Sequence, residues 1–121
     1  MKDETKAWLA KAEEDLEVAK DMFKLKKYGY TAFWCQQSAE KALKAMQIEK
    51  ENRFDKVHDL VLLSKKVSAP PEIIEICKKL TIAYTYTRYP DVETGEEDME
   101  KISREFVKDA GEVIRWTKKN L

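Results

Sequence analysis

Residues 33–45 read FWCQQSAEKALKA, and this stretch is the most informative part of the chain about its fold. It mixes small side chains with long unbranched ones and contains neither glycine nor proline, a composition that favours a helix. Its small residues would let a neighbouring helix approach closely. We therefore predict a helix over residues 30–50, followed by a loop over the polar, aperiodic residues 51–57.

Outside this stretch, apolar residues recur at three- and four-residue steps, the spacing of one helix face. The spacing predicts further helices over residues 3–27, 71–87 and 96–119, and a short one that begins at His58. Gly29 is expected at the C′ position after the first helix, because glycine tolerates a left-handed backbone there.

The composition fits one globular domain over residues 1–121, with 43% hydrophobic and 38% charged residues. Only three glycines and three prolines are present, which leaves little room for a turn-rich β architecture. We expect an all-α fold, an antiparallel four-helix up-and-down bundle with an additional short helix.

Charge and cysteine usage exclude several classes of protein. Lys+Arg and Asp+Glu balance at 23 each, which argues against nonspecific coating of nucleic acid but not against a local basic cleft. The chain has no apolar run of ~18 residues and no signal-like start, so we expect a cytoplasmic protein without membrane contact. Cys35 and Cys77 form no CxxC or His/Cys cluster, so we expect two buried free thiols and no metal or cofactor.

Arg53 and His58 are the candidate catalytic pair. Arg53 lies in the predicted loop, and His58 follows that loop directly. His58 is the only histidine of the chain. Alone, an arginine five positions before a histidine is a weak pattern. In the structural alternative, His58 or Asp59 caps the third helix and Arg53 is solvated.

Three stretches together resemble the HEPN family. Residues 33–45 resemble its second-helix signature, residues 58–60 (HDL) resemble the element that opens its third helix, and residues 86–91 (YTRYPD) resemble its RYPD element. They occur in the family's order, and the resemblance covers nearly the whole chain. The family's polar R-x4–6-H motif then falls on Arg53 and His58.

The resemblance implies a function. HEPN domains pair as homodimers whose two motifs face each other across a cleft. Many are metal-independent endoribonucleases, often toxins partnered by a minimal nucleotidyltransferase antitoxin. RNA supplies the 2′-OH nucleophile, His58 would move a proton, and Arg53 would hold the phosphate and stabilise the transition state.

Two positions depart from the family's pattern. Phe54 stands where catalytic members usually carry a polar residue, and Leu60 stands where some toxins carry the tyrosine that the antitoxin modifies. A second hypothesis therefore stays open, a non-catalytic module that docks a nucleotidyltransferase or binds a nucleotide.

Glu40 and Lys56 are further candidates for substrate binding. Lys56 lies between the two motif residues in the sequence. We expect Glu40 either to orient Arg53 or to pair with a base across the bundle. The alternative is a surface pair between Glu40 and Lys44, one helical turn apart.

Tyr86 and Arg88 are the remaining candidates, at the predicted end of the fourth helix. We expect them to approach the cleft, where the tyrosine ring could stack a nucleobase. In the alternative they only accompany the helix stop that Pro90 imposes.

Overall fold

The computed structural model describes the backbone of residues 1–88 and 96–121, and the side chains of residues 1–82 and 98–121. Every regular element in the described part is a helix, so the all-α prediction is confirmed. The five helices are α1 (Asp3–Lys24), α2 (Tyr28–Glu51), α3 (Leu60–Lys66), α4 (Pro71–Arg88) and α5 (Glu96–Asn120).

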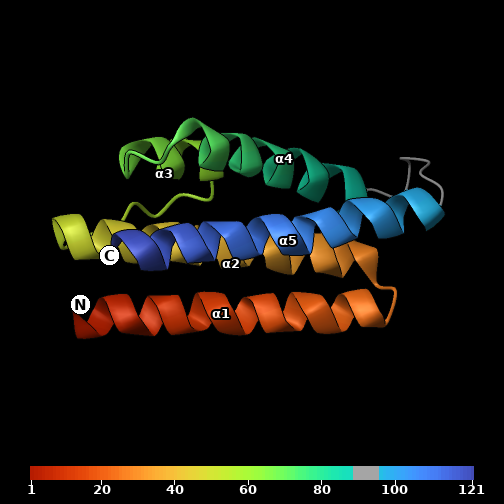
Figure 1. The fold of residues 1–121 in the computed structure, drawn as a ribbon, viewed down its shortest axis with the longest axis horizontal. Helices are drawn as coiled ribbons and strands as arrows, with labels where there is room; N and C mark the ends of the chain where they lie inside the picture. Colours follow the sequence, from red (N-terminus) through yellow and green to blue (C-terminus); the bar gives the residue numbers. More distant parts are fainter. Residues whose placement is uncertain (89–95) are drawn as a thin grey trace.

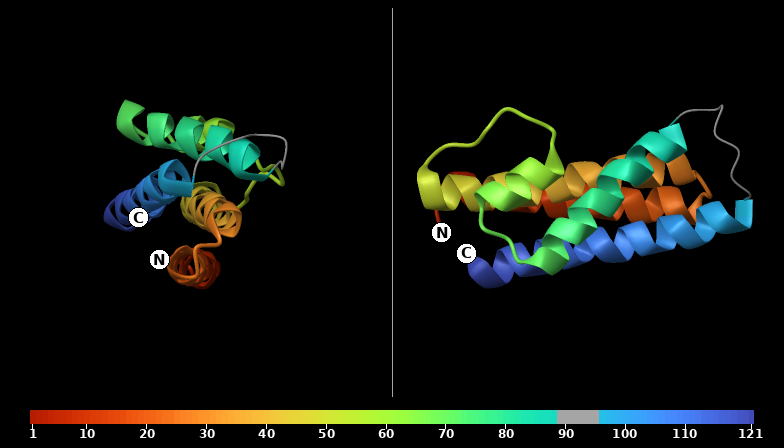
Figure 2. Two further views of the ribbon diagram at one scale, coloured as in Figure 1. Left: turned by 90° about the vertical axis from the view of Figure 1, so that its right-hand side faces the viewer. Right: turned by 90° about the horizontal axis from the view of Figure 1, so that it is seen from above.

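The four long helices run alternately up and down along one axis, with both chain termini at the same end (Figure 1). Seen from the end, α2 lies between α1 on one side and α4 and α5 on the other (Figure 2). It packs against all four other helices. The antiparallel bundle with one short extra helix is therefore confirmed, and α2 is its central element.

Small residues set the spacing between α1 and α2. Ala39 and Ala42 of α2 and Ala12 and Ala19 of α1 have no exposed surface. The Ser38 hydroxyl donates a hydrogen bond of 2.7 Å to the backbone carbonyl of Ala12, which requires the two helices to lie close together. The small residues that favoured the helix prediction thus also allow the close packing that it implied.

The turn between α1 and α2 corrects the prediction for Gly29, which lies in the first turn of α2. Lys26 takes the left-handed conformation instead, with φ of 58°. The amides of Lys26 and Lys27 donate to the carbonyls of Phe23 and Met22, the hydrogen bonds of a Schellman motif. These bonds satisfy the last carbonyls of α1 and offset the cost of a positive φ at a lysine.

The start of α3 also differs from the prediction, because His58 lies before the helix and not at its first position. Asp59 is the N-cap, and its carboxylate accepts a hydrogen bond of 3.1 Å from the amide of Leu62. His58 therefore remains in the loop, where its side chain is free to turn towards α2.

The two cysteines are buried and free, as predicted. Burial raises the pKa of the Cys35 thiol and of the Cys77 thiol to about 12. Both therefore pack as small apolar side chains. Within the described residues, no helix is long and apolar enough to cross a membrane.

Candidate functional site

The loop over residues 52–59 is fastened to α2 by two glutamines of that helix. Gln47 brackets Asp55: its amide nitrogen donates to the Asp55 carboxylate at 2.8 Å, and its amide oxygen accepts from the Asp55 backbone at 2.9 Å. Gln36 donates to the backbone carbonyl of His58 at 3.3 Å. Gln36 and Gln47 are three turns apart on one helix face, so α2 holds the loop at Asp55 and again at His58.

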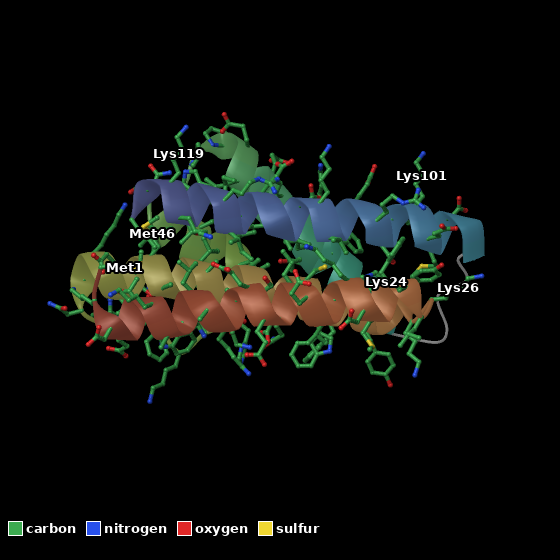
Figure 3. All side chains as sticks on the ribbon, turned by 60° about the horizontal axis from the view of Figure 1, so that its bottom comes forward. Met1, Lys24, Lys26, Met46, Lys101 and Lys119 are labelled. Carbon is green, nitrogen blue, oxygen red and sulfur yellow. The ribbon has the colours of Figure 1, made fainter. Side chains whose placement is uncertain are left out.

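The point where this loop leaves α2 is held by the start of the chain. The Lys2 ammonium donates to the carbonyls of Ile48 and Glu49 at 3.0 and 2.9 Å, and it also contacts the Asn52 side chain. These are carbonyls of the last helical turn, where a cation is favourable. Hydrogen bonds from the Lys2 amide and the Thr5 hydroxyl hold the pKa of Glu49 below its usual value. Figure 3 shows Met1 at the same end of the molecule as Met46 of α2.

The His58 ring contacts a buried carboxylate. Its Nδ1 lies 3.0 and 3.1 Å from the two carboxylate oxygens of Glu40, whose side chain is only 5% exposed. The His58 side chain itself is 82% exposed. When Glu40 is ionised its carboxylate only accepts hydrogen bonds, and Nδ1 is then the donor of the contact. In a neutral imidazole with its proton on Nδ1, the other ring nitrogen, Nε2, has a free lone pair.

Glu40 holds two further partners on its own helix. The Lys44 ammonium lies 3.1 Å from Oε2, and the Gln36 amide nitrogen lies 3.4 Å from Oε1. Glu40 therefore contacts His58 and not Arg53, which corrects the expected orientation of the arginine. The Glu40–Lys44 pair does form, but it is buried and not at the surface.

Arg53 lies in the same loop with its side chain 58% exposed. One terminal nitrogen contacts the Glu51 carboxylate at 3.1 Å, and the other contacts Asp55 at 2.5 Å. Asp55 also binds the Lys66 ammonium at 2.7 Å. Hydrogen bonds from Lys66, Gln47 and Arg53 hold the pKa of Asp55 well below its usual range.

Phe54 has a packing role that explains the departure from the family's pattern. Its ring lies 4.7 Å from the ring of Trp8 on α1, centroid to centroid. The Lys44 ammonium lies 5.6 Å from the Phe54 centroid and 6.0 Å from the Trp8 centroid. No signal in the sequence indicated this contact, because Trp8 and Phe54 belong to segments far apart in the chain.

The other candidates are placed less centrally. Lys56 is exposed and makes no hydrogen bond or ion pair with the described residues. Arg88 is the last residue of α4, and the side chains of Tyr86 and Arg88 lie outside the described ones. Among side chains that the structure describes, no three of His, Cys, Asp or Glu are grouped to hold a metal ion.

The arrangement therefore offers two exposed functional groups on one anchored loop. One is an imidazole that a buried carboxylate orients from behind, which suits proton transfer. The other is a guanidinium that can bind an anion. Each is held by its own carboxylates, and they do not bond to each other.

Comparison with protein families gives a match to the model of the HEPN domain over residues 5–121. A comparison with curated proteins finds no significant match.

Solved structures share the fold over nearly the whole chain. TT1696 from Thermus thermophilus superposes with a TM-score of 0.86 at 24% identity, over 99% of this chain and 100% of that one. ST0689, an archaeal HEPN homologue, has a TM-score of 0.78 at 29% identity, over 99% and 98% of the two chains. A HEPN domain protein from Thermotoga maritima has a TM-score of 0.78 at 21% identity, over 93% and 95%.

Proposed function

The chain belongs to the HEPN family, and from this premise we propose that it is a metal-independent endoribonuclease. His58 transfers the proton, and Arg53 holds the phosphate at which RNA is cut. The observation that carries the proposal is the buried Glu40 carboxylate behind the exposed His58 ring. The contact fixes one ring nitrogen of an exposed histidine, which is how an orienting carboxylate holds a catalytic histidine.

The chemistry follows from the two ring nitrogens. Nε2 of His58 accepts the proton of the ribose 2′-OH while that oxygen attacks the adjacent phosphorus, and the bond to the 5′ oxygen breaks. The products are a 2′,3′-cyclic phosphate and a 5′-OH. Glu40 keeps its hydrogen bond to Nδ1 throughout and stabilises the imidazolium that forms, as the carboxylate of a catalytic triad does.

Arg53 supplies the charge that the phosphate requires. A guanidinium has five N–H donors, and the contacts with Glu51 and Asp55 engage its two terminal nitrogens. The remaining donors on this exposed side chain suit a phosphate oxygen. They would stabilise the extra negative charge of the pentacoordinate transition state.

A second copy of the chain completes the mechanism. The leaving 5′ oxygen must receive a proton in the same reaction in which the 2′-OH loses one, and one imidazole supplies only one of these transfers at a time. A homodimer would present a second His58 to the same cleft. We expect a dimer by light scattering at micromolar concentration, and a monomer would remove this part of the mechanism.

The experiment is an RNA-cleavage assay with chelator present. We expect wild type to cleave, and His58→Ala and Arg53→Ala to lose at least about a hundredfold in rate. Lys101→Ala is the control, an exposed lysine that Figure 3 places far from the end of the molecule that carries Met1. Cleavage that is equal in wild type and His58→Ala, or that stops with chelator, would contradict the proposal.

The same proposal includes a partner. As a family toxin, the chain would be neutralised by a minimal nucleotidyltransferase, and co-purification with such a protein is expected. Leu60 stands where some toxins carry the tyrosine target, so inhibition would act by docking.

A second candidate function is a non-catalytic module that docks this partner or binds a nucleotide. The observation in its favour is that Arg53 is already neutralised by Glu51 and Asp55. Partner or nucleotide binding without cleavage would support it, with nucleotide affinity measured by calorimetry.

A further inference from the structure

Lys44 is a lysine whose charged end is removed from water. Its side chain is only 6% exposed, although a lysine normally keeps its ammonium in solvent. The ammonium lies within 6.0 Å of the ring centres of Trp8 and Phe54. A buried cation is costly unless it is paired, so this position needs a reason.

The pairing of Lys44 links it directly to the candidate site. Its ammonium and Nδ1 of His58 both contact the same carboxylate, that of Glu40, at 3.1 Å and 3.0 Å. Lys44 and Glu40 cancel each other's charge, so the buried pair is neutral when the imidazole is neutral. Without Lys44, the protonated imidazole would be the only cation in contact with the buried carboxylate.

The other nearby charges are engaged elsewhere. On α1, Asp15 pairs with Lys41, which lies one turn before Lys44 on α2. In the loop, Asp55 binds Arg53 and Lys66. Among the described residues, Glu40 therefore has two possible cationic partners, Lys44 and the His58 ring.

We propose that Lys44 is a positioning residue for His58: it neutralises the Glu40 carboxylate, so that the imidazole holds its proton less tightly than it would beside an unpaired carboxylate, and Nε2 is more readily available to accept one. The catalytic meaning of this role rests on the proposed function, but the electrostatic effect does not require cleavage. Trp8 and Phe54 shield the Lys44–Glu40 pair from water, which strengthens the effect of one charge on another.

The single histidine makes this inference measurable. The imidazole signals of His58 can be followed by NMR against pH without interference from another histidine. If Lys44 is replaced by methionine, loss of the His58 proton would leave an unpaired buried carboxylate. The imidazole should then hold its proton to higher pH, by about one unit or more, a tenfold change in the fraction charged.

Lys41→Met is the matched control. It removes an ammonium from the same helix and also breaks a pair with a buried acid, Asp15, but it does not touch Glu40. Lys44→Arg keeps the positive charge. Neither change should move the midpoint of the His58 titration by more than about 0.3 pH units, well under the shift from losing a neighbouring charge.

A double variant keeps the test decisive if Lys44→Met fails to fold. Glu40→Gln with Lys44→Met removes both charges, and the midpoint should stay within about half a unit of wild type because the two losses cancel. A shift of a full unit in this variant would overturn the proposal. So would an unmoved midpoint in a folded Lys44→Met, or an equal shift in Lys41→Met.

Cleavage assays on the same samples keep the two proposals apart. A shifted His58 titration in a chain that cuts no RNA supports the role of Lys44 and overturns the nuclease. Intact cleavage by Lys44→Met with an unchanged His58 titration supports the nuclease and overturns the role of Lys44. The expected result is a titration that moves upward in Lys44→Met alone, with the pH profile of cleavage moving in the same direction.

Discussion

Two faces of α2 are buried with opposite chemistry. One face packs the bundle core through fully buried apolar side chains such as Ala42, Ala45 and Met46. The other carries a row of buried polar side chains at steps of four, four and three residues: Gln36, Glu40, Lys44 and Gln47. The first face stabilises the fold by removing apolar surface from water. The second gains little stability and instead fixes the loop that carries Arg53 and His58.

The largest expected effect comes from the apolar face. Met46→Ala should lower the free energy of unfolding by about 4 kcal/mol, because it removes a fully buried side chain and leaves a cavity. Urea unfolding followed by circular dichroism measures this. The His58 titration of the folded fraction should not change, and a shift there would show that the two faces are not separable.

A smaller effect is expected from the charged pair of the polar face. Above the pH at which His58 loses its proton, Lys44→Met should lower the free energy of unfolding by about 3 kcal/mol, because it then leaves the Glu40 carboxylate buried without a cation. Adding Glu40→Gln should restore most of this loss, since no buried charge then remains. Unfolding of the two single variants and the double variant gives the coupling energy, and additive losses would contradict a paired role.

Gln47→Ala should cost only about 1 kcal/mol in stability, because it removes hydrogen bonds to Asp55 that water can partly replace. It should slow RNA cleavage more strongly than this small loss of stability alone would, since the loop loses the two hydrogen bonds that hold Asp55. Gln37→Ala is the control, a neighbouring glutamine that bonds to Gln36 and not to the loop. Equal rates in both variants would show that the bracket does not position the site.

The smallest expected effect is the contribution of Asp55 to the pH dependence of stability. The pKa of Asp55 is lower in the folded chain than its ordinary value, mainly through the Lys66 contact. Its contribution to stability is therefore present above about pH 4, and it is lost as the pH falls below that value. Between pH 5 and pH 3, wild type should lose more urea resistance than Asp55→Asn. Parallel curves would contradict this.

The sequence predicted the apolar face well and the polar face poorly. Periodicity placed the helices to within a few residues, because burial of an apolar stripe follows directly from spacing. The predicted end of the first helix was wrong because Gly29 was expected at its C′ position. The hydrogen bonds of the turn place Lys26 in the left-handed conformation instead. Nothing in the sequence around Lys26 indicated that this lysine would take a positive φ.

The contacts of the candidate site could not be predicted from the sequence. The family motif named Arg53 and His58, and Glu40 was expected to orient Arg53, to pair with a base across the bundle, or to form a surface pair with Lys44. The contact between Glu40 and His58 depends on how the loop returns along α2, and Gln36 and Gln47 determine that path. Such long-range contacts leave no periodic trace in the sequence.

The proposed mechanism depends above all on the contact between Glu40 and Nδ1 of His58, which would leave Nε2 able to accept a proton. A long-range 1H–15N NMR spectrum of the neutral imidazole reports this arrangement, since the chain has one histidine. We expect the proton on Nδ1 and an unprotonated Nε2 in wild type, and loss of that preference in Glu40→Ala. A proton on Nε2 in wild type would contradict the mechanism.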